Sequence, residues 1–199
     1  MKKSVLMFVV VAAAVLAVPA MSWAATIAGS DHDLTTKGWT LTEVCKSCHT
    51  PHNAIAGNAP LWNHTSTVAT FTPYTSTTLN ATNLSPGPQS KACLSCHDGT
   101  VAIDSFTGGA GTHTMTGGAL VGIDLSNDHP VGFTYDLDLA TADTGLVTPA
   151  DASHVVTGIP LYASKMECAS CHNVHDPVNG SFLRNTNDAS ALCFKCHNK

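Results

Sequence analysis

The sequence reads Cys45-Lys46-Ser47-Cys48-His49 near its start, and this C-x-x-C-H pattern returns three more times along the 199 residues. The other copies are Cys93-Leu94-Ser95-Cys96-His97, Cys168-Ala169-Ser170-Cys171-His172 and Cys193-Phe194-Lys195-Cys196-His197. C-x-x-C-H is the attachment motif of c-type haem. One helical turn presents both thiols to the two vinyl groups on one porphyrin edge, and the histidine that follows binds the iron. We therefore expect four covalently bound haem c groups, with His49, His97, His172 and His197 as the proximal iron ligands.

Three other uses of paired cysteines are weaker explanations of this pattern. Four C-x-x-C pairs could form two Cys₄ zinc sites, but zinc sites of this kind do not need a histidine after every second cysteine. Thioredoxin-like chemistry needs a βαβ context, which the sequence lacks. Four disulfides would explain an even number of cysteines in a secreted chain but not the four histidines. Since the motifs use all eight cysteines, four haems explain the pattern best.

Seven of the 11 histidines remain for the second axial position, and bis-His ligation of four irons needs four of them. His52 and His175 each stand three residues after a proximal histidine, so they cannot reach the far face of their own haem but can reach a haem stacked alongside. The candidate distal ligands are His52, His129, His175, His64 and His32. Five candidates for four irons leave at least one that is not a ligand, and the roles of His113 and His154 stay open.

The flanks of three candidates suggest how they would act. Pro130 restricts the backbone at His129, which suits a fixed ligand, and Asp128 is near enough to orient a ring nitrogen. Trp62, two residues before His64, could pack on a porphyrin face. His32 lies close to the expected mature N-terminus, where it could bind an iron in another subunit or be solvated.

The first 24 residues have the pattern of a secretory signal peptide. Lys2 and Lys3 precede an uncharged apolar run, and Ser22-Trp23-Ala24 offers small residues for cleavage before Ala25. We therefore expect residues 25–199 to form the exported tetrahaem domain, in an oxidising compartment and without a stable membrane span. The chain has 9 basic and 14 acidic residues and no basic stripe, which argues against nucleic-acid binding.

The motifs form two doubled units, at about 45–97 and 168–197, joined by a Gly/Thr-rich loop segment. Each unit reads C-x-x-C-H-x-x-H, a spacer, then C-x-x-C-H. We expect mostly loops, with short helices around the haem motifs and over Asp188–Lys195, where Asp188 would be the N-cap. Short strands are expected at 100–103, 119–125 and 131–135. Four stacked haems would supply the core that an aromatic content of 6% cannot.

The pattern resembles the doubled C-x-x-C-H cytochromes and is similar to the OmcE-type extracellular tetrahaem cytochromes of metal-reducing bacteria. The segments that carry the likeness are His32–Leu34, Cys48–Ala54, Pro60–His64, Cys93–Ala102 and Asp128–Phe133. The resemblance implies subunits that polymerise into filaments with a continuous chain of bis-His haems. It also implies that one axial histidine comes from a neighbouring subunit, and His32 matches that donor by position.

These observations predict electron transfer rather than catalysis, so no catalytic residue is expected. The first hypothesis is the subunit of an extracellular conductive filament, with copies of itself, redox partner cytochromes and extracellular acceptors such as metal oxides as partners. The second is a monomeric periplasmic shuttle, which usually carries a lysine patch for docking. The third is a multihaem reductase, which needs an open iron, and the surplus of histidines argues against it.

Overall fold

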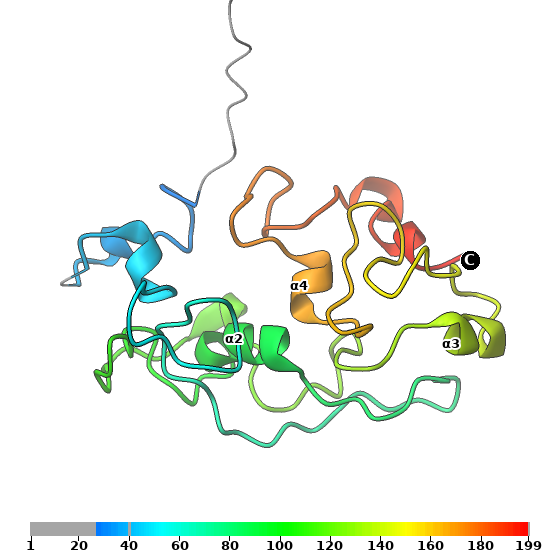
Figure 1. Cartoon of the computed structure of the whole chain (residues 1–199), viewed down its shortest axis with the longest axis horizontal. Helices are drawn as coiled ribbons and strands as arrows, with labels where there is room; N and C mark the ends of the chain where they lie inside the picture. The colour runs from blue at the N-terminus through cyan, green and yellow to red at the C-terminus, as the bar shows by residue number, and fades with distance from the viewer. Residues whose placement is uncertain (1–26, 40, 199) are drawn as a thin grey trace, which may run out of the picture.

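The computed structural model describes residues 27–39 and 41–198. The expected signal peptide, 1–24, lies outside these residues. Within them the chain forms short helices joined by long loops (Figure 1). The helices are η1 (Leu34–Lys37), η2 (Val44–Ser47), α2 (Pro88–His97), η3 (Gly117–Ala119), α3 (Leu137–Ala142), α4 (Cys168–Cys171), η4 (Asp188–Ser190) and η5 (Cys193–Lys195).

Every C-x-x-C-H motif lies on or beside a helical turn, which confirms that part of the prediction. η2, α4 and η5 are single turns at the first, third and fourth motifs, whereas α2 is a helix of 10 residues that ends with the second. Pro88 occupies the first helical position of α2, where its missing N–H costs nothing. Gly99, with φ +75°, turns the chain away after the helix.

The three predicted strands are wrong, since no strand occurs in the described ranges and only isolated bridges pair the backbone there. Gly122 (φ +84°) and Gly132 (φ +80°) interrupt two of the expected runs with left-handed backbone. Three bridges hold proximal histidines: His49 pairs with Trp62, His172 with Leu183 and His197 with Leu146. Isolated backbone bridges at these histidines, rather than the pairing of strands in a sheet, therefore hold the loops together here.

The helix predicted over Asp188–Lys195 is broken into η4 and η5. Ala189 and Ser190 both adopt positive φ, +48° and +63°, which interrupts regular helical hydrogen bonding. The N-cap of η4 is Asn187 rather than Asp188, so that capping prediction is also wrong.

A small apolar core lies beside the C-terminal motif. Its buried members are Phe133, Tyr135, Leu139, Val155, Ile159, Leu161 and Met166. The Tyr135 hydroxyl lies 2.8 Å from the carbonyl oxygen of Val147 and 3.2 Å from that of Cys196. The core therefore holds the fourth motif in place through the protein backbone.

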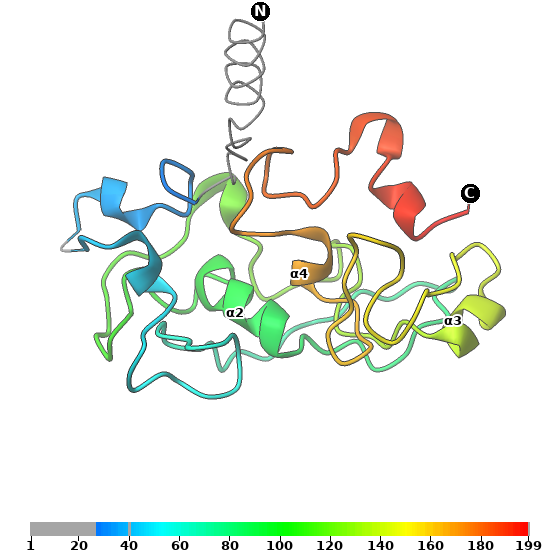
Figure 2. The same ribbon diagram turned by 45° about the horizontal axis from the view of Figure 1, so that its top comes forward.

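The two doubled units contact each other through their inner motifs. α2 and α4, which carry the second and third motifs, lie side by side near the middle of the molecule (Figures 1 and 2). Residues 27–39 and 41–60 lie toward one end of the molecule, and α3 lies at the opposite end near the C-terminal motif. Contacts between halves of the sequence thus set the spacing of the motifs.

Candidate functional site

The local geometry of the motifs matches what attachment to a porphyrin edge requires. The peptide N–H of the motif histidine donates to the carbonyl oxygen of the first cysteine at 2.8 Å for His49 and at 3.0 Å for His172 and His197. Each turn therefore carries its two sulfurs and its imidazole as one local unit.

All eight cysteines are free thiols, so the disulfide alternative finds no support in the structure. Interaction with the Cys168 thiol, together with burial, raises the pKa of Cys93, whereas interaction with Cys93 lowers the pKa of Cys168. The Cys93 thiol donates its hydrogen bond to the carbonyl oxygen of Gln89, 3.4 Å from the sulfur. The second and third attachment sites are therefore in direct contact. No three His, Cys, Asp or Glu side chains among the described residues converge on a metal-sized site, which also gives no support to the zinc alternative.

Three proximal imidazoles are held in the tautomer that an iron ligand needs. Nδ1 lies 2.8 Å from the carbonyl oxygen of Pro60 in His49, 2.7 Å from that of Ala119 in His97 and 2.8 Å from that of Ser181 in His172. Because a carbonyl oxygen can only accept, Nδ1 must carry the hydrogen. Nε2 is then unprotonated and can bind a metal, an orientation typical of ligating histidines.

Each of three proximal histidines has a candidate distal histidine facing it. The ring centroids are 6.2 Å apart in the pair His49–His175, with the planes 20° from parallel. They are 5.9 Å apart in His97–His32, with the planes 68° apart, and 6.4 Å in His197–His129, with the planes 70° apart, so these two contacts are edge-on. The three pairs join residues far apart in sequence.

These separations fit a metal ion between the two rings. Imidazole nitrogens bind such metals at about 2 Å, so two rings on opposite sides of one iron have centroids roughly 6 Å apart. His129 also has its Nδ1 3.0 Å from the carbonyl oxygen of Pro130, which again leaves Nε2 unprotonated. The donor set of the described residues therefore fits bis-His haem at three positions.

His32 is enclosed in a way that suits a ligand. Burial, with the nearby charge of His97, lowers the pKa of His32 to about 4, and the neutral imidazole is the form that binds metals. Its buried Nδ1 has no hydrogen-bond partner, and neither has the buried Nε1 of Trp62. Such groups in a native protein call for an additional partner, and a haem with its propionates would be one.

The remaining two candidates differ in their surroundings. His52 is exposed on the loop after the first motif. His64 is 1% exposed, with Nδ1 2.8 Å from the Thr65 carbonyl oxygen and Nε2 2.9 Å from that of Ala102. Both its ring nitrogens face carbonyl oxygens, so the imidazole joins two loops in this arrangement. No ring contact pairs either histidine with His172 in the described structure.

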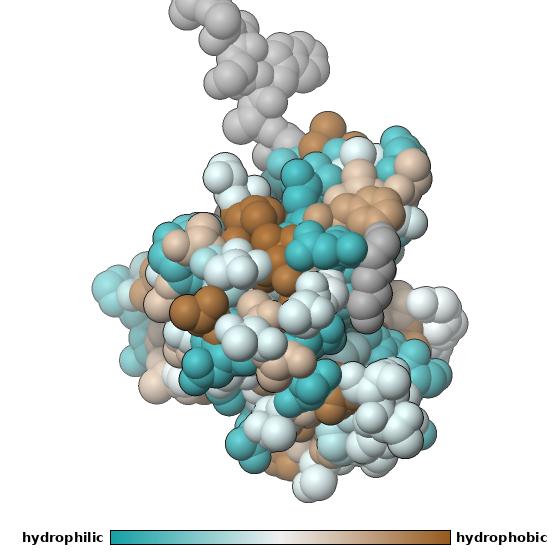
Figure 3. Space-filling view, turned by 90° about the vertical axis from the view of Figure 1, so that its right-hand side faces the viewer, coloured by the Kyte–Doolittle hydropathy of each residue, from teal (hydrophilic) through white to brown (hydrophobic). Residues whose placement is uncertain are grey.

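Large apolar side chains reach the surface beside the proximal histidines. Leu61 is 55% exposed and follows Pro60, the acceptor of His49, and Leu120 is 44% exposed and follows Ala119, the acceptor of His97. Phe194, inside the fourth motif, is 53% exposed. Figure 3 shows apolar side chains among polar ones on the face at the α3 end. A porphyrin on each imidazole would cover such side chains.

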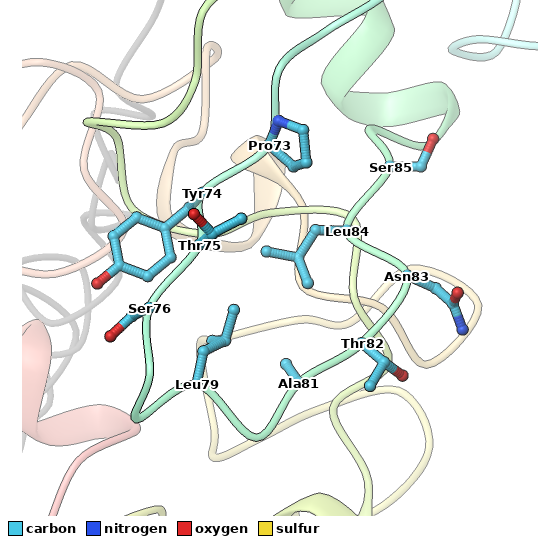
Figure 4. Close-up of a pocket in the computed structure, with 10 residues that line it drawn as sticks. All are labelled: Pro73, Tyr74, Thr75, Ser76, Leu79, Ala81, Thr82, Asn83, Leu84 and Ser85. Atoms are coloured by element: carbon cyan, nitrogen blue, oxygen red, sulfur yellow. The ribbon is translucent and has the colours of Figure 1, made fainter.

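A hollow of about 590 Å³ lies in the loop of residues 73–85 (Figure 4). The side chains of Leu79, Ala81 and Leu84 point into it, whereas Asn83 points away. Leu84 also lines a smaller hollow that reaches His129, and it packs on the same core as Cys196. The volume lies within the range of small-molecule and cofactor pockets, and its lining comes from this one loop.

His113 and His154 have carboxylate partners on the surface. Nδ1 of His113 lies 2.8 Å from Asp104 Oδ2 and its ring stacks on Trp39 at 4.9 Å. Nδ1 of His154 lies 3.5 Å from Asp151 Oδ1. Neither histidine faces a motif histidine in the ring contacts of the described residues.

Asp104 predicts an acid-sensitive contribution to stability. Burial raises the pKa of Asp104, but hydrogen bonds from the peptide N–H and ring of His113 and from the peptide N–H of Thr112 outweigh this and leave it well below its usual value. A lowered folded-state pKa stabilises the protein above the unfolded value of about 4, and this stabilisation is lost as pH falls through the folded value. Asp104→Asn should therefore lower the melting temperature at pH 7 and make the melting temperature fall less steeply as the pH drops below about 4. The exposed control Asp138→Asn should change neither the melting temperature nor its pH dependence. Parallel pH profiles of wild type and Asp104→Asn would contradict this.

The sequence pattern did not single out Glu167, which is buried between the second and third motifs. Its only local signal is a carboxylate placed directly before a motif cysteine. Its contacts with α2 come from residues 77 to 80 positions away and could not be read from spacing.

No helix in the described part of the chain is long and apolar enough to cross a bilayer. A family model for the doubled CXXCH motif matches residues 162–199, which hold the third and fourth motifs. No curated protein matches the chain. The match and the motifs indicate covalently bound haem c, and they support a multihaem c-type cytochrome that acts in electron transfer.

Proposed function

We propose that the chain binds four haem c groups, each with two axial histidines, and carries electrons between them. The observation that supports this most directly is the set of three facing imidazole pairs at 5.9, 6.2 and 6.4 Å. In this proposal His175, His32 and His129 complete the irons of His49, His97 and His197. All eight motif cysteines form the covalent attachments.

We assign His52 as the distal ligand of the fourth iron, the one bound by His172, because the two motifs would exchange distal ligands. His49-Thr50-Pro51-His52 and His172-Asn173-Val174-His175 have the same spacing, and His175 faces His49. An arrangement in which each of the two motifs supplies the distal ligand of the other gives His52 to the iron of His172. His64 then keeps its structural hydrogen bonds.

Haem supplies the one-electron Fe(III)/Fe(II) couple, and the protein supplies its ligands, spacing and insulation. The carbonyl oxygens of Pro60, Ala119 and Ser181 hold three proximal imidazoles in one tautomer. Two fixed axial ligands mean that little rearranges when an electron arrives, and no iron is left open for substrate. We therefore propose a carrier rather than an enzyme.

We further propose that copies of the chain assemble head to tail into an extracellular filament, which exchanges electrons with partner cytochromes and acceptors such as metal oxides. The resemblance to OmcE-type cytochromes supports this, as do the apolar side chains exposed beside the motifs. Between Lys91 and Lys165 the sequence has eight aspartates and no lysine or arginine. This stretch offers no basic docking patch of the kind a periplasmic shuttle uses.

Mass spectrometry and redox spectroscopy of the exported protein, with cryo-electron microscopy of the sheared cell-surface fraction, test both levels of the proposal. We expect a mass increase of four haems, fully low-spin spectra and filaments. Fewer haems or an open iron would overturn the tetrahaem carrier. Dispersed monomers in the surface and purified fractions would overturn the filament and favour the periplasmic shuttle. An imidazole from His32 crossing each interface would replace the pairing of His32 with His97 inside one chain.

A further inference from the structure

Glu167 is a carboxylate buried between the helices that carry the second and third motifs. Glu167 is only 1% exposed to solvent and directly precedes Cys168. Its oxygens accept hydrogen bonds from the peptide N–H of Gly87, at 3.0 and 3.1 Å, and from the hydroxyl of Ser90. Both of these donors belong to the start of α2.

The same few groups fix α4 against α2. Ser90 Oγ accepts a hydrogen bond from the peptide N–H of Cys168 at 2.9 Å, and the Ser170 hydroxyl accepts one from the peptide N–H of Glu167 at 3.0 Å. A Cβ atom at position 87 would overlap Glu167 Oε1, so a side chain there would displace the carboxylate from this contact. The carboxylate is therefore built into the contact between the two helices.

Its hydrogen-bond donors are neutral, so no cation cancels its charge. Among the described residues no Lys or Arg forms an ion pair with Glu167; the ion pairs there involve His113 and His154. A negative charge in a buried site interacts strongly with a nearby iron because the local dielectric constant is low. It favours the more positive Fe(III) state over Fe(II).

We propose that Glu167 lowers the reduction potentials of the two haems attached through α2 and α4, and so sets the direction of electron flow through the middle of the chain. This rests on the proposed function. The packing of α4 on α2, with the peptide N–H of Cys168 bound to Ser90 Oγ, places both attachment sites next to the same carboxylate. The first and fourth motifs have no buried carboxylate just before their cysteines. Glu43, before the first motif, is exposed, and position 192, before the fourth, is leucine.

The test is spectroelectrochemical titration of the exported holoprotein, with haem NMR signals used to assign each step. Glu167→Gln keeps the shape and removes the charge, and we expect the potentials of the second and third haems to rise while the other two stay in place. Glu43→Gln removes the same charge from an exposed position before the first motif, where solvent screens it, and should move no potential.

Two further variants separate charge from position. Glu167→Asp keeps the charge, so it should retain the low potentials even though its shorter side chain loosens the contact with α2. Ser90→Ala removes a donor to the carboxylate and should lower the same two potentials, and it replaces Glu167→Gln as the test if that variant fails to take up four haems. Unchanged potentials in Glu167→Gln would overturn the inference, and so would an equal rise in Glu167→Asp and Glu167→Gln. If Glu167→Gln does not take up four haems, unchanged potentials in Ser90→Ala would overturn it. A wild-type protein without four low-spin haems would instead overturn the proposed function.

Discussion

The chain with all eight cysteines replaced by alanine is expected to show no cooperative thermal unfolding transition. The described structure has no sheet, and its largest helix has 10 residues. Its main core cluster has seven buried members. Ordering each backbone residue costs about 1–2 kcal/mol, and loops without regular hydrogen bonding bury too little apolar surface to offset this.

Haem changes that balance in two ways. Each attached porphyrin adds a large rigid apolar surface beside side chains such as Leu61, Leu120 and Phe194, which the protein alone leaves exposed. Each bis-His iron also joins distant parts of the chain, as His49 and His175 illustrate. We expect circular dichroism of the cysteine-free chain to lack the transition that the holoprotein shows.

A matched control removes the haem and keeps the cysteines. The unaltered chain, expressed without the haem attachment machinery and kept reduced, should behave like the eight-alanine variant, because the haems rather than the thiols stabilise the fold. A cooperative transition in either haem-free protein would show that the polypeptide core suffices and would contradict the prediction.

Replacing His175 with alanine should convert one iron of the four from low spin to high spin. The imidazole facing His49 at 6.2 Å is then lost, and water or an empty position takes its place. Absorption and electron paramagnetic resonance spectra should show roughly one quarter of the haem in the high-spin state, with haem content unchanged because the thioether bonds remain. Added imidazole should restore the low-spin spectrum.

His154→Ala is the matched control for this experiment. His154 is also exposed, but its partner is Asp151 at 3.5 Å and not a motif histidine. This variant should stay fully low-spin. A fully low-spin His175→Ala protein, or a high-spin signal in His154→Ala, would contradict the assignment of His175 to the iron of His49.

Long-range contacts account for most of what sequence reasoning missed. The expected strand at 131–135 fails because Gly132 adopts φ +80° and lies against the backbone of Ser85, where a Cβ would be 2.1 Å from the carbonyl oxygen. Glu167 acquires its role only because α4 packs on α2. Neither contact leaves a periodic signal in the chain.

The sequence by itself determined the local chemistry. Two cysteines and a histidine within five residues fall on one helical turn, so the spacing alone predicts a haem attachment site and its proximal ligand at each motif. The described structure forms these turns, with hydrogen bonds from the peptide N–H of His49 to the carbonyl oxygen of Cys45 and from that of His172 to the carbonyl oxygen of Cys168. Geometry over so few residues depends on adjacent backbone angles and little else.

Only the tertiary structure decided which histidines face each other. His175, His32 and His129 lie 126, 65 and 68 positions from the motif histidines they face, and the two doubled units contact each other through α2 and α4. Such pairings depend on how loops close and how α2 packs on α4, and these are properties of the whole chain. That is why the sequence supplied the candidate ligands and only the folded chain paired them.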